Sequence, residues 1–149
     1  MLRETLTNDL KTAMKAGEKR RVDTIRLVNA ALKDKDIEAR GLGKSVVDED
    51  ILALLQKMIK SRQESLGIYE GAGREDLALV EREEIAIIGT YLPQQMSEDA
   101  VRDAIRAAIV ETGAASVKDM GKVIAALKSK FAGQMDFGKA SGLVRDFLK

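Results

Sequence analysis

The sequence predicts an all-α fold in two parts, a multihelical N-terminal domain over residues 1–92 and a small three-helix tail domain over residues 93–149. Apolar residues recur at helical intervals through almost the whole chain, and no stretch alternates with the period of two that a strand would show. Glycines and the single proline divide this pattern into helix-length segments. With 45% hydrophobic and 33% charged residues, the 149-residue chain can bury a core without disulfides or metal.

The first two helices are predicted to form a hairpin. One begins near the N-terminus and ends at Gly17, and the other runs from about residue 18 to residue 40 and ends at Gly41 and Gly43, since glycine commonly follows the last turn of a helix. The side chains expected inside are Leu2, Leu6, Leu10 and Met14 of the first helix and Ile25, Val28 and Leu32 of the second.

Two further helices complete the predicted N-terminal domain. Asp48 is the expected N-cap of the third helix, which ends at Gly71. The fourth helix starts after Gly73 and ends at Pro93, which lacks the backbone donor that a helix interior needs. The apolar stripes consist of Ile51, Leu55, Met58, Ile59, Leu66 and Tyr69, and then of Leu77, Val80, Ile85, Ile88 and Tyr91.

The tail domain is predicted to hold three short helices after a proline-stiffened joint. Ser97 caps the first, which ends at Gly113. Ser116 with Asp119 forms a capping-box pattern for the second, and Asp136 caps the third. The expected core positions are Val101, Ile105, Ile109, Met120, Val123, Ile124, Leu127, Phe131, Ala140, Leu143, Val144 and Phe147.

Composition excludes several kinds of chemistry. The chain has no cysteine and no histidine, which excludes cysteine nucleophiles, His-dependent triads and zinc sites built on Cys or His. The glycines at 41 and 43, followed by Lys44 and Ser45, lack the spacing of a phosphate-binding loop and follow a helix. We therefore expect no catalytic residues, no metal and no cofactor.

No segment approaches the roughly 20 apolar residues that span a bilayer. Met1 to Asp9 carry charges and no apolar run as long as that of a signal peptide. We expect a cytoplasmic protein with no membrane partner.

Three charged residues fall on apolar stripes. Arg62 lies on the stripe of the third predicted helix, and Glu81 and Glu84 lie on that of the fourth. Burying one such charge alone is costly, so the favoured interpretation is a structural ion pair of Arg62 with one or both glutamates across two facing helices. The alternative is a carboxylate pair used for acid-base chemistry or for a hard metal ion.

Positive charge is unevenly distributed over a chain whose net charge is only +1. Residues 1–92 hold 16 basic and 17 acidic side chains, whereas residues 114–149 hold 7 basic and 3 acidic. On the second predicted helix a spacing of seven residues aligns four cations, a secondary basic ridge that either contacts phosphates or is ordinary solvated surface. The ridge consists of Lys19, Arg26, Lys33 and Arg40.

The second helix of the tail has a polar face of lysines and small residues opposite its apolar side. Small residues between lysines allow a sugar-phosphate backbone to approach closely. A helix-helix contact through the same small residues is the alternative. The face contains Lys118, Gly121, Lys122, Ala125, Lys128, Ser129 and Ala132.

Several segments, taken together and in order, resemble the YqeY family over nearly the whole chain. They are Thr24 to Lys33, Ile59 to Ser65, Gly73 to Leu77 with Glu81 and Glu84, Tyr91 to Pro93, and Lys118 to Val123. The last third is also similar to the tail of the GatB component of the tRNA-dependent amidotransferase, a domain that holds tRNA. That similarity implies contacts from Gly121, Lys122 and Gly133. Gln134, Met135 and Phe137 depart from the pattern around the turn.

The resemblance and the lysine face together predict a non-catalytic protein that binds tRNA or another structured RNA, or an adaptor for an amidotransferase or translation-related protein. Lys118, Gly121, Lys122, Lys128 and Gly133 are the predicted nucleic-acid-binding residues. One alternative, implied by the kinship, is a carbon-nitrogen ligase activity with glutamine as amido-nitrogen donor. The other is a module for protein-protein interaction alone.

Overall fold

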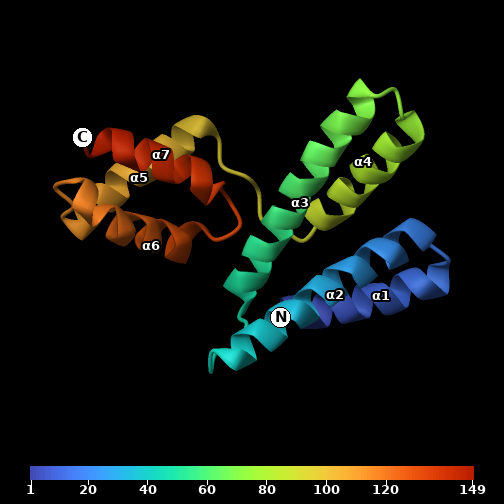
Figure 1. The fold of residues 1–149 in the computed structure, drawn as a ribbon. Coiled ribbons are helices and arrows are strands. Elements are labelled where there is room, and N and C mark those ends of the chain that lie inside the picture. The colour runs from blue at the N-terminus through green and yellow to red at the C-terminus, as the bar shows by residue number, and fades with distance from the viewer. The chain divides into compact units, whose positions relative to one another are not determined.

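The computed structural model describes residues 1–149 and contains seven α-helices, one short 3₁₀ helix and no strand (Figure 1). The predicted all-α fold is confirmed. The chain forms two compact units, Met1–Leu92 and Pro93–Lys149, here called the N-terminal unit and the C-terminal unit. No helix is both long enough and apolar enough to cross a membrane.

Two helical hairpins make up the N-terminal unit. The first consists of α1 (Leu2–Ala16) and α2 (Lys19–Gly41), and the second of α3 (Asp48–Gly71) and α4 (Glu75–Gly89), which lie side by side in Figure 1. Gly17 ends α1 with a φ of 71°, a left-handed conformation that favours glycine. The left-handed backbone of Gly17 lets the chain reverse direction within the few residues between α1 and α2.

Apolar side chains from all four helices form one core in this unit. α3 and α4 pack closely along their length, and α2 contacts both of them. The buried cluster consists of Leu6, Ile25, Val28, Leu32, Ile51, Leu54, Leu55 and Ile88. All of these residues except Leu54 are predicted core positions, so helical periodicity identified most of this cluster.

Three details of the sequence prediction are wrong here. Met14 is 52% exposed, and Ala13 is the buried residue of that turn. Asp48 is the first residue of α3, whose N-cap is Val47, and the Val47 N–H donates to the Asp50 carboxylate over 3.0 Å. α4 ends at Gly89, four residues before Pro93, because the chain turns there.

The C-terminal unit consists of α5 (Glu98–Thr112), η1 (Val117–Asp119), α6 (Met120–Phe131) and α7 (Phe137–Phe147). Two predicted caps are confirmed: Ser97 Oγ accepts from the Ala100 N–H, and the Asp136 carboxylate accepts from the N–H groups of Gly138 and Lys139. The buried core is apolar throughout. It comprises Ile105, Ala108, Val123, Leu127, Met135, Ala140, Val144 and Leu148.

The predicted capping box at the start of the second tail helix is wrong. Ser116 makes no side-chain cap, and a 3₁₀ turn precedes α6, which begins at Met120. Asp119 Oδ2 accepts from the Ala115 N–H over 2.9 Å, so its carboxylate holds the preceding loop.

Candidate functional site

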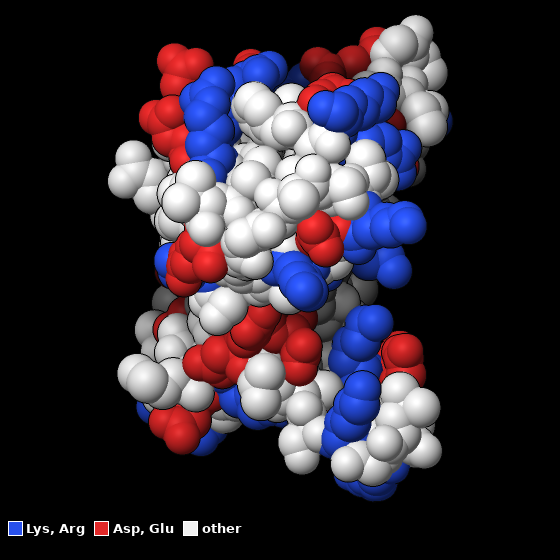
Figure 2. Space-filling model, turned by 90° about the vertical axis from the view of Figure 1, so that its left-hand side faces the viewer, with Lys and Arg blue, Asp and Glu red and all other residues white.

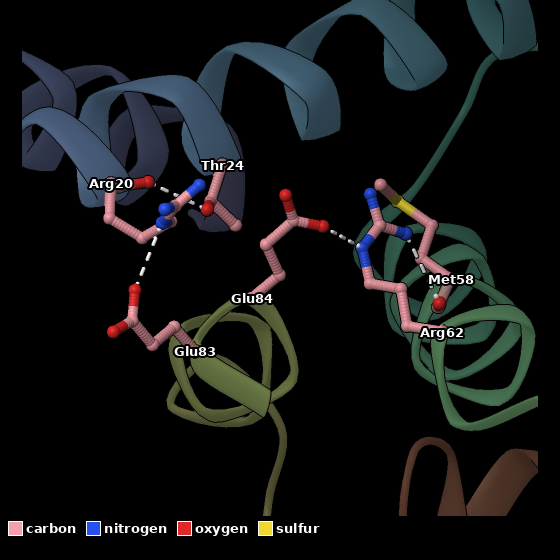
Figure 3. A network of polar contacts seen from close by, with 6 residues as sticks. All are labelled: Arg20, Thr24, Met58, Arg62, Glu83 and Glu84. Atoms are coloured by element: carbon pink, nitrogen blue, oxygen red, sulfur yellow. Dashed lines mark hydrogen bonds and ion pairs between the residues drawn. The ribbon is translucent and has the colours of Figure 1, made fainter. Parts of the chain in front are cut away.

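The charged residues on the apolar stripes of α3 and α4 meet inside the N-terminal unit. Arg62 Nε donates to Glu84 Oε2 over 2.7 Å, and Arg62 Nη1 donates to the Met58 carbonyl over 3.2 Å (Figure 3). The side chains of Arg62 and Glu84 are only 16% and 13% exposed. A pair so shielded from water has a structural role, because loss of either partner leaves a buried charge.

Glu81 does not join this pair. Its Oε2 is buried and has no hydrogen-bond partner. Burial raises the pKa of Glu81, the nearby Glu84 carboxylate raises it further, and Arg62 opposes both effects. Of the two glutamates considered for Arg62, only Glu84 therefore makes the contact, and the folded protein disfavours the ionised form of Glu81.

A second pair lies on the α2 side of α4. Arg20 Nε donates to Glu83 Oε2 over 2.9 Å, and the hydroxyl of Thr24, which is fully buried, donates to the Arg20 carbonyl over 2.7 Å (Figure 3). No three acidic side chains are placed to hold a metal ion together. The polar contacts on this side of α4 are ion pairs and backbone hydrogen bonds.

Sequence reasoning missed a contact that ties the end of the N-terminal unit to its first helix. The Tyr91 hydroxyl donates to Asp9 Oδ2 over 2.5 Å, and Arg21 lies 3.6 Å from the same carboxylate oxygen. Burial, together with the bond to Asp9, raises the pKa of Tyr91 to about 12. The sequence did indicate that Asp9 faces inward, because Asp9 lies three residues after the buried Leu6 on α1.

The four cations of the basic ridge lie along one side of α2 as predicted by their spacing. Lys19, Arg26, Lys33 and Arg40 are all exposed, and none has a carboxylate oxygen within 4.0 Å. Seven residues of helix rise about 10.5 Å, so successive cations are about that far apart along the axis. The ridge is thus unpaired within the protein.

The lysine face of α6, which includes Lys118 of the preceding η1 turn, is also exposed and has no ion-pair partner. Lys118, Lys122 and Lys128 have no carboxylate oxygen within 4.0 Å, and the small residues Gly121 and Ala125 between them are open to solvent. The positive charge of Lys122 acts on Asp119, but the Asp119 carboxylate accepts its hydrogen bonds from backbone N–H groups. These hydrogen bonds, of which the one from the Ala115 N–H has the largest effect, lower the pKa of Asp119.

Lys128 also has an aromatic neighbour, since its Nζ lies 6.0 Å from the centroid of the Phe137 ring. That distance is at the outer limit of a cation-π contact, so the ammonium group stays accessible to other partners. Four of the five predicted nucleic-acid-binding residues are therefore exposed, namely Lys118, Gly121, Lys122 and Lys128.

Gly133 differs from those four. It is buried, it adopts a φ of 77°, and its carbonyl accepts a hydrogen bond of 2.7 Å from Gln95 Nε2. The Met96 N–H donates to the Gln134 carbonyl next to it, and Met135 is a core residue. The turn that departs from the GatB pattern is thus packed inside the unit.

Charge is mixed over the molecular face in Figure 2. Lysine and arginine side chains lie among acidic ones, with uncharged surface between them. This mixture agrees with the net charge of +1, so any attraction for a polyanion has to come from local surfaces such as the lysine face.

Comparison with known proteins identifies relatives with long shared segments. The relatives in Vanderwaltozyma polyspora and Meyerozyma guilliermondii, both called Altered inheritance of mitochondria protein 41, mitochondrial, are 36% identical over 88 and 104 residues. Those segments cover 58% and 68% of this chain but 46% and 53% of the relatives. A protein of the same name from Pyrenophora tritici-repentis is 28% identical over 130 residues, which cover 84% of this chain and 70% of the relative.

This chain thus spans about half the length of the first two relatives. The family model described as Yqey-like protein matches residues 3–148, which are all of both units except Met1, Leu2 and Lys149. The chain therefore belongs to the YqeY family.

Proposed function

We propose that this YqeY protein binds tRNA or another structured RNA through the lysine face of α6 and acts as an adaptor that performs no chemistry on the RNA. The observation that carries the proposal is that Lys118, Lys122 and Lys128 are exposed together without any carboxylate within 4.0 Å. Cations that are not neutralised inside the protein can release counterions from a phosphate backbone.

The residues between these lysines favour backbone contact over base reading. Gly121 and Ala125 leave room for the sugar-phosphate chain to lie against the helix. All three phenylalanines of the chain, Phe131, Phe137 and Phe147, pack against the core of the unit, so none is free to stack on a base. Recognition is therefore expected to depend on RNA shape and charge.

The similarity of the tail to that of GatB in the amidotransferase supports tRNA as the RNA. The names of the fungal relatives describe them as mitochondrial. Mitochondria and the cytoplasm both contain tRNA, so the proposed role is compatible with either compartment. For this chain the cytoplasm stays our prediction, and fractionation of cells that express a tagged full-length protein tests it.

The test is the affinity of the full chain for tRNA across a salt series. Three phosphate contacts predict that the logarithm of the association constant falls with the logarithm of salt concentration with a slope of about −2 to −3. Replacing Lys118, Lys122 and Lys128 by glutamine should remove most of that slope and weaken binding at low salt by at least about tenfold. Fluorescence anisotropy of labelled tRNA measures both quantities.

A matched control removes the same number of cations from the same unit. Arg102, Arg106 and Lys130 are each paired with a carboxylate, at 3.1, 3.0 and 2.5 Å. Their triple replacement by glutamine should leave the salt slope nearly unchanged. The proposal would be contradicted by equal losses of tRNA affinity in both variants or by no binding at low salt. Amidation of mischarged tRNA by the protein alone would contradict it as well.

A further inference from the structure

The corner between the end of α2 and the start of α3 carries an open groove that RNA binding by α6 does not use. Its volume is about 320 Å³. Leu42, Val46 and Leu54 line it together with two alanines, and Leu54 also belongs to the buried core of the N-terminal unit. The floor of the groove is therefore apolar and is backed by a well-packed part of the fold.

Large apolar side chains are unusually exposed along this corner. Ile37 at the end of α2 is 58% exposed, Leu42 is 67% exposed, and Val47 at the N-cap of α3 is 56% exposed. Of these three, Leu42 lines the groove, whereas Ile37 and Val47 lie outside its lining. An exposed leucine next to an apolar groove gives a partner a continuous apolar surface to cover.

The charged groups of the groove leave a surplus of positive charge. Lys35 pairs with Glu38 at 3.5 Å, and the Asp50 carboxylate accepts the Val47 N–H. Lys44 and Lys57 also line the groove, are exposed and have no carboxylate within 4.0 Å. The groove lining thus holds three lysines and two carboxylates, a surplus of one positive charge, and Lys44 and Lys57 have no ion-pair partner.

We propose that this α2–α3 groove docks an acidic amphipathic helix of a partner protein. Apolar side chains of that helix would fill the groove and cover Leu42, and its carboxylates would face Lys44 and Lys57. The apolar lining and the exposed Leu42 side chain match the aliphatic side chains of such a helix, which a small organic anion lacks. RNA offers phosphates for the lysines but no aliphatic side chains for the floor.

This interaction uses the N-terminal unit and goes beyond the proposed RNA binding, so either can fail without the other. The probe is a synthetic helical peptide with leucines along one face and glutamates on the other. Added to the isotope-labelled full chain, it should shift the backbone amide resonances of Leu42, Ser45 and Ala53, which are groove residues. The same peptide with lysines in place of glutamates should bind at least about tenfold more weakly.

Two variants separate the charged and the apolar parts of the contact. The double charge reversal Lys44→Glu and Lys57→Glu should weaken binding of the acidic peptide at least about tenfold. Leu42→Ser should also weaken it severalfold, and the exposure of all three side chains means that the fold is retained. Circular dichroism verifies that the variants keep their helices.

The control reverses two other cations of the same unit. Lys11 and Lys15 on α1 are exposed and have no carboxylate within 4.0 Å, so Lys11→Glu with Lys15→Glu should leave peptide affinity unchanged. The proposal is overturned if the acidic peptide does not bind or shifts other amides, or if Leu42→Ser has no effect. Displacement of the peptide from the groove by tRNA would overturn it as well.

Discussion

The two units of this protein use charged side chains in different ways. The N-terminal unit places Arg62 and Glu84 between packed helices, where water reaches little of either side chain. The C-terminal unit has an apolar core throughout, and the lysines of α6 stay at its surface without a carboxylate partner. Loss of one partner of the Arg62–Glu84 pair would therefore leave a buried charge in the first unit, whereas the charge of the lysines on α6 is available to a binding partner.

The strongest way to break this comparison is to remove the cation from the N-terminal unit. Arg62→Met leaves Glu84 without its partner and Glu81 without its nearest compensating charge, in surroundings of low polarity. We expect the free energy of unfolding to fall by about 3 kcal/mol. Urea unfolding followed by circular dichroism measures the change.

The control for this substitution is an arginine with two partners at the surface. Arg82 lies between Glu70 and Glu75, and its side chain is 40% exposed. Arg82→Met should cost less than about 1 kcal/mol, because exposed ion pairs contribute little. Similar losses in both variants would mean that the position of Arg62 inside the unit has no special importance.

A smaller effect is expected from the contact between Tyr91 and Asp9. Tyr91→Phe removes a short hydrogen bond to a carboxylate and should lower the free energy of unfolding by about 1 to 2 kcal/mol. In the wild-type protein the Tyr91 hydroxyl should ionise at a pH of about 12, and the corresponding rise in ultraviolet absorbance should be absent from the variant.

Tyr69→Phe is the matched control, since Tyr69 is the other tyrosine of the chain. It should keep the absorbance step at a pH of about 12. Loss of that step in the Tyr69 variant, or its retention in the Tyr91 variant, would show that the wrong hydroxyl had been assigned.

Helical periodicity and glycine positions were enough to predict the fold class and most core residues, because both reflect local backbone geometry. Arg62 and Glu84 were also predictable as partners, since charges on apolar stripes have few ways to be neutralised. Which glutamate pairs was not predictable, because Glu81 and Glu84 are nearly one helical turn apart and the choice depends on how α3 packs on α4.

The bond from Tyr91 to Asp9 and the burial of Gly133 were missed for a related reason. Each depends on segments distant in sequence that meet only in the folded chain: α1 with the end of the N-terminal unit, and Gln95 with the turn after α6. The lysine face needed no such information, because its members lie on α6 and the turns next to it and are close together in sequence. Its use by RNA is a prediction that the salt series has yet to test.

The smallest predicted effect concerns Glu81 and has the opposite sign. Because the folded state raises the pKa of Glu81, the folded protein binds its proton more tightly than the unfolded chain does. Stability associated with Glu81 therefore falls as pH rises from the usual glutamate value of about 4.3 through the raised pKa, and stays reduced above it. Glu81→Gln mimics the protonated form and should stabilise the protein by up to about 1 kcal/mol near neutral pH.

That gain should shrink as the pH is lowered and vanish below about 4.3, where the glutamate is protonated in both states. Urea unfolding of the two proteins across this range measures the effect of Glu81, which includes its repulsion by the Glu84 carboxylate. Glu83→Gln serves as the control, because it removes the exposed partner of Arg20 and should not stabilise the protein at any pH. A Glu81→Gln variant less stable than wild type at neutral pH would show that the ionised carboxylate is favoured by Arg62 after all. Both glutamates near Arg62 would then favour the folded state in their ionised form, and the contrast with the apolar core of the C-terminal unit would become sharper.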